Sequence, residues 1–257
     1  MSPRWPWTQP QVLGHRGAAA HAPENTLAAF RLALEQGADG IELDVRLSRD
    51  GEVMVLHDGR VERVTDGQGA LADLTRAEIQ RLDAGSRFST AFAGERIPSL
   101  AEVFESLGDR PLYDLEIKNF SAPHNGLEAK VLDLVRRYGL EERVLFSSFN
   151  PLALRFLQRA LPAAPAGLLL LGGAAGRLEE AVLAGWAAPG CVGLHHAGLT
   201  VAFAARQHHR AVLVWGVQSP AEALCGYGLG AAALIADDPG MVRRTLAAQV
   251  ESPCQPR

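Results

Sequence analysis

The sequence lacks the features that mark a disulfide-rich, membrane-spanning or exported protein. Its 257 residues contain three cysteines, Cys191, Cys225 and Cys254, a scattered odd set that is typical of neither a metal cluster nor a disulfide framework. No stretch reaches the roughly 18 apolar residues that a membrane-spanning helix needs. The N-terminal segment contains three prolines and no apolar run, so it does not resemble a signal peptide. We therefore expect a reducing, cytoplasmic location and no membrane insertion.

An excess of charge of one sign is also lacking. The chain has 25 Lys and Arg residues against 29 Asp and Glu residues, a formal net charge of −4, and no basic stripe. This balance argues against nucleic acid as a partner, although it does not exclude a small phosphate-containing substrate. Hydrophobic residues at 47% and charged residues at 21% are ordinary for a globular enzyme and exclude a disordered chain.

Short β-like segments alternate with longer helical stretches, a pattern typical of βαβ units and a parallel sheet. Eight candidate strands are found at residues 11–15, 40–45, 112–118, 143–149, 166–171, 191–196, 211–217 and 233–237. A (β/α)₈ barrel usually takes about 250 residues. We therefore expect an α/β fold of this type, a TIM barrel, as a single domain over residues 1–257 with its core at about 12–242.

Helix boundaries are indicated between these strands. Leu27, Phe30 and Leu34 have helical spacing after Pro23, and Gly37 is a typical stop signal. Three further helix starts are indicated by two capping boxes and an Asn-Pro pair, namely Thr75 with Glu78, Ser99 with Glu102, and Asn150 with Pro151.

Two features depart from a plain barrel. Asp50 and Gly51 form a two-residue hairpin signal after the second strand. Residues 59–97 then form an insertion that is too long for an ordinary connection. A two-residue hairpin loop would place His57 directly opposite Asp44.

The expected hairpin and the third barrel strand each have two distinct faces, because side chains alternate across a strand. The polar face of the hairpin is expected to carry Glu42, Asp44, Arg46, Val55 and His57. Its packed apolar face is expected to carry Ile41, Leu43, Val45, Leu47, Met54 and Leu56. The third strand repeats the pattern, with Asp114, Glu116 and Lys118 on one face and Tyr113, Leu115 and Ile117 on the other.

Three carboxylates on these polar faces indicate a metal site. The carboxyl ends of barrel strands form the active site, and charges buried there are costly unless they are paired or bind a metal. Glu42, Asp44 and Glu116 would repel one another without a cation among them, and hard oxygen ligands suit Mg²⁺ or Ca²⁺. Asp114 lies deeper, where it can pair with a basic residue, and is left out of this set.

Basic residues complete the expected site. The first strand ends in His15 and Arg16. The imidazole of histidine has a pKa suited to acid–base catalysis near neutral pH. The planar guanidinium group of arginine presents several N–H donors in a geometry that matches the oxygens of a phosphate. Together with His57, Lys118 and the carboxylates, they predict metal-assisted phosphoryl chemistry. A lone strand-end histidine is more often structural, so the combination carries this prediction.

Other residues keep two interpretations. Glu24 and Asn25 fit the first turn of a helix as well as they fit the site. His195 and His196 end the sixth strand, where a packing or surface role is favoured over a role in the site. Trp215 is either an aromatic residue of the barrel core or an apolar wall for the alcohol of a substrate.

The motifs, taken together, resemble the glycerophosphodiester phosphodiesterase family over about residues 12–242. They are HRG at 15–17, PENT at 23–26, IELDV at 41–45, LHD at 56–58, IPSLAEVFE at 97–105, LEIK at 115–118, SSFNP at 147–151 and VLVWGVQ at 212–218. In lacking a signal peptide, the sequence resembles the bacterial cytosolic branch of this family and not the periplasmic branch. Two rim positions depart from the family pattern: Trp-Gly-Val-Gln at 215–218 replaces Trp-Thr-Val-Asn, and Ala-Asp at 236–237 replaces Thr-Asp.

The resemblance implies a metal-dependent hydrolase that converts small glycerophosphodiesters to sn-glycerol 3-phosphate and an alcohol. It implies a role for each site residue: His15 and His57 as the acid–base pair, Glu42, Asp44 and Glu116 as ligands of one divalent cation, Arg16 and Lys118 as phosphate contacts, and Trp215 as a substrate contact. The abundance of Mg²⁺ in cytosol favours that ion over Ca²⁺ or Mn²⁺. A similarity to phosphatidylinositol-specific phospholipases C suggests His15 as the base and His57 as the acid.

Several alternatives stay open at this point. The sequence does not fix which histidine is the base, whether water attacks directly or through a cyclic phosphate, which alcohol leaves, or the oligomeric state. A barrel phospholipase that acts on intact lipids is disfavoured because residues 59–97 are polar. A binding module without catalysis is disfavoured because no residue of the set is missing.

Overall fold

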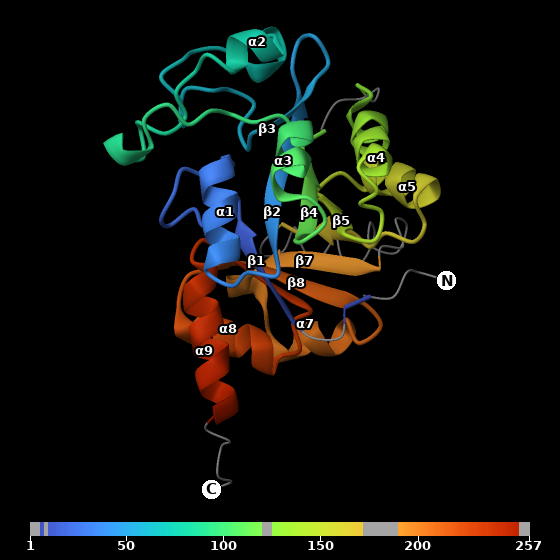
Figure 1. Cartoon of the computed structure of the whole chain (residues 1–257). Helices are drawn as coiled ribbons and strands as arrows, with labels where there is room; N and C mark the ends of the chain where they lie inside the picture. Colours follow the sequence, from blue (N-terminus) through green and yellow to red (C-terminus); the bar gives the residue numbers. More distant parts are fainter. Residues whose placement is uncertain (1–5, 8–9, 120–124, 172–189, 252–257) are drawn as a thin grey trace, which may run out of the picture.

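The structure is a computed structural model that describes residues 6–7, 10–119, 125–171 and 190–251 (Figure 1). Its strands are β1 (Gln11–His15), β2 (Gly40–Leu47), β3 (Val53–Val55), β4 (Leu112–Ile117), β5 (Val144–Ser148), β6 (Ala166–Leu169), β7 (Cys191–His195), β8 (Ala211–Val217) and β9 (Ala233–Ala236). They form one sheet in the order β1-β9-β8-β7-β6-β5-β4-β2-β3. Because β1 also pairs with β2, the parallel strands close into a barrel, and β3 is an antiparallel addition. The predicted (β/α)₈ TIM barrel is confirmed.

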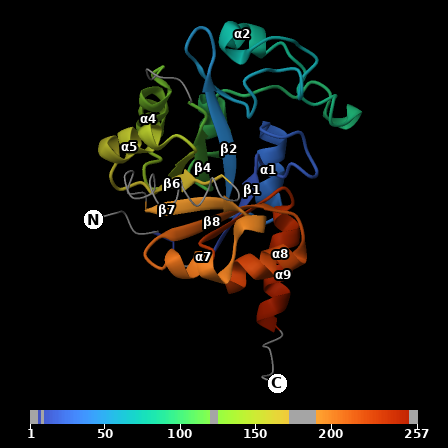
Figure 2. The same ribbon diagram turned by 180° about the vertical axis from the view of Figure 1, so that it is seen from behind.

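Helices surround the barrel (Figures 1 and 2). The α-helices are α1 (Leu27–Glu35), α2 (Arg76–Ile79), α3 (Leu100–Leu107), α4 (Leu127–Arg137), α5 (Pro151–Ala160), α7 (Val201–Arg206), α8 (Pro220–Gly228) and α9 (Pro239–Glu251). The short 3₁₀ helices are η1 (Leu71–Asp73), η2 (Thr90–Phe92) and η3 (His196–Gly198). Both predicted capping boxes form, at the starts of α2 and α3, and Asn150 caps α5 as predicted. Within the described residues, no helix combines the length and the apolar character needed to cross a bilayer.

The largest apolar cluster lies between the barrel and its helices. It includes the predicted packed faces of β2 and β4, for example Ile41, Leu43 and Leu115, each fully buried. A smaller cluster comes from side chains that point into the barrel, including Leu13 in the middle of β1 and Leu112 at the start of β4. Because side chains alternate along a strand, the polar residues further along the same inward faces lie at the carboxyl end.

The hairpin after β2 differs from its prediction by one residue. Val45 pairs with Val55, and the loop has three residues and ends at Gly51, whose φ is 79°. A two-residue type I′ loop would need positive φ at both central residues. Gly51 adopts a positive φ but Asp50 does not; instead, its carboxylate accepts a hydrogen bond from the Ser48 hydroxyl at 2.6 Å.

This shift corrects two expectations about β3. Val55 packs in the main core, whereas Met54 and Leu56 pack in a separate cluster, so the predicted faces of this strand are wrong. The predicted opposition of His57 and Asp44 is also wrong, because the Leu56 amide donates to the Asp44 carbonyl at 3.0 Å. His57 therefore enters the site from the loop that follows β3.

Residues 59–97 lie outside the barrel, beside the hairpin, and contain η1, α2 and η2 (Figure 1). Their apolar side chains form a cluster of their own with two residues from the β3 segment. Its buried members are Met54, Leu56, Val61, Leu71, Ile79, Ala84 and Ile97. The insertion is thus anchored to the segment of chain directly before His57.

Candidate active site

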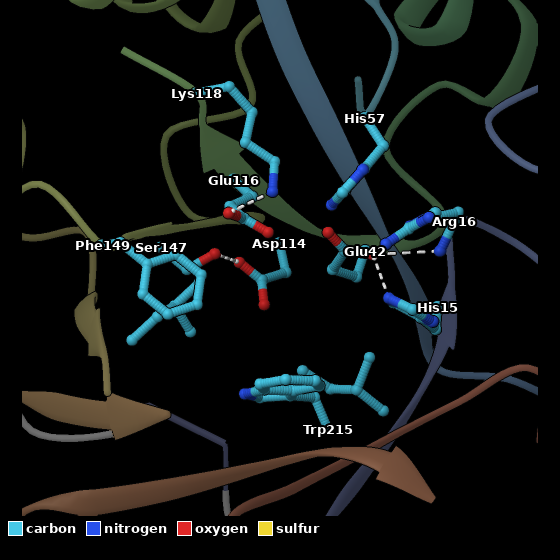
Figure 3. A pocket seen from close by; sticks show the side chains of 12 residues that line it. His15, Arg16, Glu42, His57, Asp114, Glu116, Lys118, Ser147, Phe149 and Trp215 are labelled. Carbon is cyan, nitrogen blue, oxygen red and sulfur yellow. Dashed lines mark hydrogen bonds and ion pairs between the residues drawn. The ribbon is translucent and has the colours of Figure 1, made fainter. Parts of the chain in front are cut away.

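A pocket of about 150 Å³ is formed by inward side chains and strand-end residues of the barrel (Figure 3). It is lined by His15, Arg16, Glu42, His57, Asp114, Glu116, Lys118, Ser147, Phe149, Leu169, Trp215 and Ile235. Seven of the eight site residues that the sequence predicts are in this lining. The eighth, Asp44, is fully buried behind it and contacts Lys118, which does line the pocket.

Three predicted metal ligands converge beside the pocket. The parallel register of β2 and β4 pairs Asp44 with Glu116 and Glu42 with Asp114. One carboxylate oxygen each from Glu42, Asp44 and Glu116 lies within 4.8 Å of the others, and all three residues are buried. This donor set of close, buried oxygens fits a hard divalent cation.

Burial makes negative charge costly at this cluster. Burial, with repulsion from Asp44, raises the pKa of Glu42 well above its ordinary range and raises the pKa of Glu116 to about 7. Asp114, which is also buried, has its pKa raised to about 7, and it accepts a hydrogen bond from the Ser147 hydroxyl at 2.6 Å. The basic partner suggested for Asp114 is therefore replaced by a serine.

The raised pKa values predict a pH-dependent stability that a bound metal removes. Because the folded-state pKa of Glu116 lies above its unfolded value, the folded protein without metal binds extra protons, and its stability should fall as pH rises from about 5 to 8. Excess Mg²⁺ should oppose this fall by binding the ionised carboxylates. Thermal unfolding midpoints in EDTA and in Mg²⁺ should diverge with rising pH; a constant difference would contradict the prediction.

Two cations compensate part of this negative charge. Lys118 Nζ lies 2.6 Å from Glu116 Oε1 and 3.1 Å from Asp44 Oδ1. Burial alone would lower the pKa of Lys118, but the attraction of Asp44 and Glu116 outweighs it and raises this pKa. Arg16 Nε lies 3.4 Å from Asp44 Oδ2, and the Arg16 backbone amide donates to Glu42 Oε2 at 3.0 Å. Both cations line the pocket, where they can contact an anion.

The turn after β1 positions Arg16. Arg16 has a φ of 54° and Gly17 a φ of 87°, both in the left-handed region that favours glycine. A Cβ on Gly17 would lie 2.6 Å from the backbone of Ala29 in α1, so the turn can approach that helix only with glycine here.

Replacing Gly17 by alanine is expected to lower the free energy of unfolding by more than about 1 kcal/mol, because the new Cβ meets backbone at an unfavourable φ. Gly228 at the end of α8 provides the matched control, since a Cβ there meets nothing within 4 Å. Urea unfolding of Gly17→Ala and Gly228→Ala measures the difference. Equal stability of the two variants would contradict this account of the turn.

The two histidines have similar surroundings. His15 Nδ1 lies 2.6 Å from Asp237 Oδ1, and His57 Nδ1 lies 2.7 Å from Asp58 Oδ1. A carboxylate at Nδ1 fixes the ring orientation and leaves Nε2 to face the pocket. Figure 3 shows both rings pointing toward Glu42, with His15 Nε2 at 4.0 Å from Glu42 Oε2.

The surroundings of His57, in the loop after β3, shift its pKa and fix its backbone. Burial lowers the pKa of His57, against the opposing attraction of Asp44 and Asp58. Although burial acts to raise the pKa of Asp58, hydrogen bonds from Arg63 and His57 hold it below its ordinary value. Arg46, whose Nε and Nη2 donate to the His57 carbonyl at 2.9 and 2.7 Å, further fixes the loop.

Several contacts of the site were missed by sequence reasoning. Buried Asn25 donates from Nδ2 to Asp44 Oδ2 at 2.9 Å, which resolves its two interpretations in favour of the site. Asp58 could have been found from its position next to His57, but nothing local points to Asp237 as the partner of His15.

The opposite side of the pocket is apolar. Phe149, Leu169 and Ile235 line it together with Trp215, whose ring packs edge-on against His195 with centroids 4.6 Å apart. The packing interpretation of His195 is thus supported. Trp215 Nε1 is buried and has no hydrogen-bond partner among the described residues.

Comparison with known proteins places this arrangement in a family. The family model of the glycerophosphoryl diester phosphodiesterase family matches residues 15–241. A curated glycerophosphodiester phosphodiesterase of Caldanaerobacter subterraneus is 49% identical over 159 residues, which are 62% of this chain and 65% of the relative. The chain thus spans slightly less than two thirds of that relative's length.

Solved structures match nearly the whole chain. A phosphodiesterase of Oleispira antarctica, solved in complex with the product sn-glycerol-3-phosphate, has a TM-score of 0.83 and 30% identity, with coverage of 93% of this chain and 97% of that one. A glycerophosphodiester phosphodiesterase of Agrobacterium tumefaciens has a TM-score of 0.78 and 29% identity, with coverage of 92% and 100%.

Proposed function

The chain belongs to the glycerophosphoryl diester phosphodiesterase family, and on this basis we propose that it hydrolyses glycerophosphodiesters to sn-glycerol 3-phosphate and an alcohol. One observation carries the proposal: two carboxylate-held histidines and two cations line a single pocket beside a buried acidic triad. The product bound to the Oleispira antarctica relative supports the choice of substrate class.

The acidic triad is the proposed metal site. Glu42, Asp44 and Glu116 would hold one divalent cation, with Mg²⁺ favoured over Ca²⁺ and Mn²⁺ by the expected cytoplasmic location, which itself stays a prediction. Bound there, a cation would polarise a phosphoryl oxygen and stabilise developing negative charge. The raised pKa values of Glu42 and Glu116 support this assignment, because ionising both carboxyl groups beside Asp44 is costly without a further cation.

The histidines supply acid and base. His15 and His57 approach Glu42 with their Nδ1 atoms held by carboxylates, so each can exchange a proton at Nε2. One takes a proton from the attacking oxygen and the other gives a proton to the oxygen of the leaving alcohol. Because the sequence does not fix which histidine is the base and which is the acid, the two residues are assigned as a pair.

The remaining lining residues bind the substrate. Arg16 and Lys118 provide donors to the phosphate, since both line the pocket beside the triad. Trp215 and Phe149 offer an apolar surface to the alcohol group.

The substrate class is tested with soluble and lipid substrates side by side. Release of sn-glycerol 3-phosphate is measured from the glycerophosphodiesters of choline, ethanolamine, glycerol and inositol, and hydrolysis of micellar phosphatidylcholine is measured in parallel. The proposal expects turnover of soluble substrates. Turnover of the micellar lipid alone would favour a lipid-acting phospholipase instead.

A further inference from the structure

One arginine of the insertion joins two loops of the site. Arg63 Nη1 and Nη2 donate to the two oxygens of Glu24, at 2.6 and 2.7 Å, and its Nε donates to Asp58 Oδ2. Glu24 lies in the loop between β1 and α1, whereas Asp58 follows β3. One planar guanidinium thus fixes two carboxylates that are distant in sequence, using its fork of donors.

Each of these carboxylates contacts a residue of the pocket. Asp58 Oδ1 lies 2.7 Å from His57 Nδ1, and Glu24 Oε1 accepts from Arg16 Nη1 at 2.9 Å. The contacts form a continuous series from His57 through Asp58, Arg63 and Glu24 to Arg16. Its two ends line the pocket, whereas Arg63 does not.

The charges along this series are mutually stabilising. Although burial acts to raise the pKa of Glu24, hydrogen bonds and attraction from Arg63 and Arg16 lower it, so Glu24 is ionised at neutral pH. The Arg63 side chain is 46% exposed, which limits its contribution to the free energy of unfolding. Its removal should therefore disturb the geometry of the site more than the stability of the fold.

We propose that Arg63 is a positioning residue that sets the orientation of His57 and the placement of Arg16 at the same time. The insertion at residues 59–97 then completes the active site of the barrel and is more than an added surface. This inference rests on the proposed phosphodiesterase function for its kinetic consequences, but its structural content concerns only the contacts of Arg63.

The first test compares Arg63→Met with Arg60→Met. Arg60 lies in the same insertion, is 66% exposed and contacts Glu62, so it is a matched control outside the pocket. For Arg63→Met we expect kcat to fall and KM to rise, with kcat/KM lowered about 10- to 100-fold, as for other residues that orient a reacting group. Arg60→Met should keep the wild-type values. Equal kinetics in both variants would overturn the proposal.

A double-mutant cycle separates positioning from general destabilisation. If Arg63 acts through Asp58, combining Arg63→Met with Asp58→Asn should cost much less than the product of the two single losses in kcat/KM. Compared with Arg63→Met, Arg63→Lys should restore activity only in part, because one ammonium group cannot reproduce the guanidinium contacts to both Glu24 and Asp58. Independent losses in the cycle would overturn the positioning of His57 through Asp58, and losses that follow the unfolding midpoint would show a structural role only.

A spectroscopic readout decides the inference even without turnover. In the wild type, neutral His57 should carry its proton on Nδ1, facing Asp58, and Arg63→Met should give a mixture of both tautomers in ¹⁵N NMR spectra of the histidine side chains. An unchanged tautomer would overturn the inference. A wild-type protein that releases no sn-glycerol 3-phosphate would instead reject the proposed function and leave this spectroscopic test decisive for Arg63.

Discussion

Replacing His57 by alanine is expected to lower kcat/KM for a glycerophosphodiester by about 10²- to 10⁴-fold, the usual contribution of a general acid or base. The structure explains why the loss should be large. Asp58 holds Nδ1, Arg46 holds the backbone carbonyl, and burial lowers the pKa of the ring, so the residue is oriented for proton transfer at Nε2. No other histidine lines the pocket within the described residues except His15.

The same loss is expected for His15→Ala, and the double variant should be little worse than either single one if the two histidines act as a unit. His209, exposed in the segment between α7 and β8, provides the matched control, and His209→Ala should keep full activity. Steady-state kinetics with a circular dichroism check of folding measures these effects. Near-normal turnover by His57→Ala would contradict the proposed mechanism.

The second large effect concerns the acidic triad. Replacing Asp44 by asparagine keeps the shape of the side chain but removes a buried charge that faces both Lys118 and Arg16. We expect kcat/KM to fall by more than about 10²-fold and metal affinity to fall at least as much, because Asp44 is a proposed direct ligand and even residues that orient ligands matter by about 10- to 100-fold. Titration calorimetry with Mg²⁺ and Mn²⁺ measures the affinity directly.

Controls keep this prediction falsifiable. Glu35→Gln, on the exposed end of α1, should bind metal as the wild type does. If Asp44→Asn fails to fold, Glu116→Gln at the pocket lining supplies the same test at a position with 9% exposure. Wild-type metal affinity in a folded variant of the triad would place the cation elsewhere.

The strand faces explain why so much of the site could be predicted. Alternation alone sets Glu42 and Asp44 on one face of β2, and Asp114 and Glu116 on one face of β4. Once the strands close into a barrel, the register of β2 against β4 brings these residues together. No knowledge of contacts between residues distant in the sequence was needed beyond the expectation of a parallel barrel.

The errors and omissions have two physical causes. The hairpin loop is one residue longer because Asp50 forms local side-chain hydrogen bonds instead of adopting positive φ. His57 reaches the pocket even so, because the loop after β3 carries it there. The contact between His15 and Asp237 depends on β1 lying between β9 and β2, and the contacts of Arg63 depend on how the insertion packs, neither of which a local pattern contains.

The most direct measurement is release of sn-glycerol 3-phosphate from glycerophosphocholine by the wild-type protein, first in EDTA and then after addition of excess Mg²⁺, beside Glu42→Ala. The account predicts no release in EDTA, release after Mg²⁺ is added, and none from the variant under either condition. Release that persists in EDTA, or that Glu42→Ala retains with Mg²⁺, would contradict a metal-assisted reaction at this triad. No release with any divalent cation would contradict the proposed function itself.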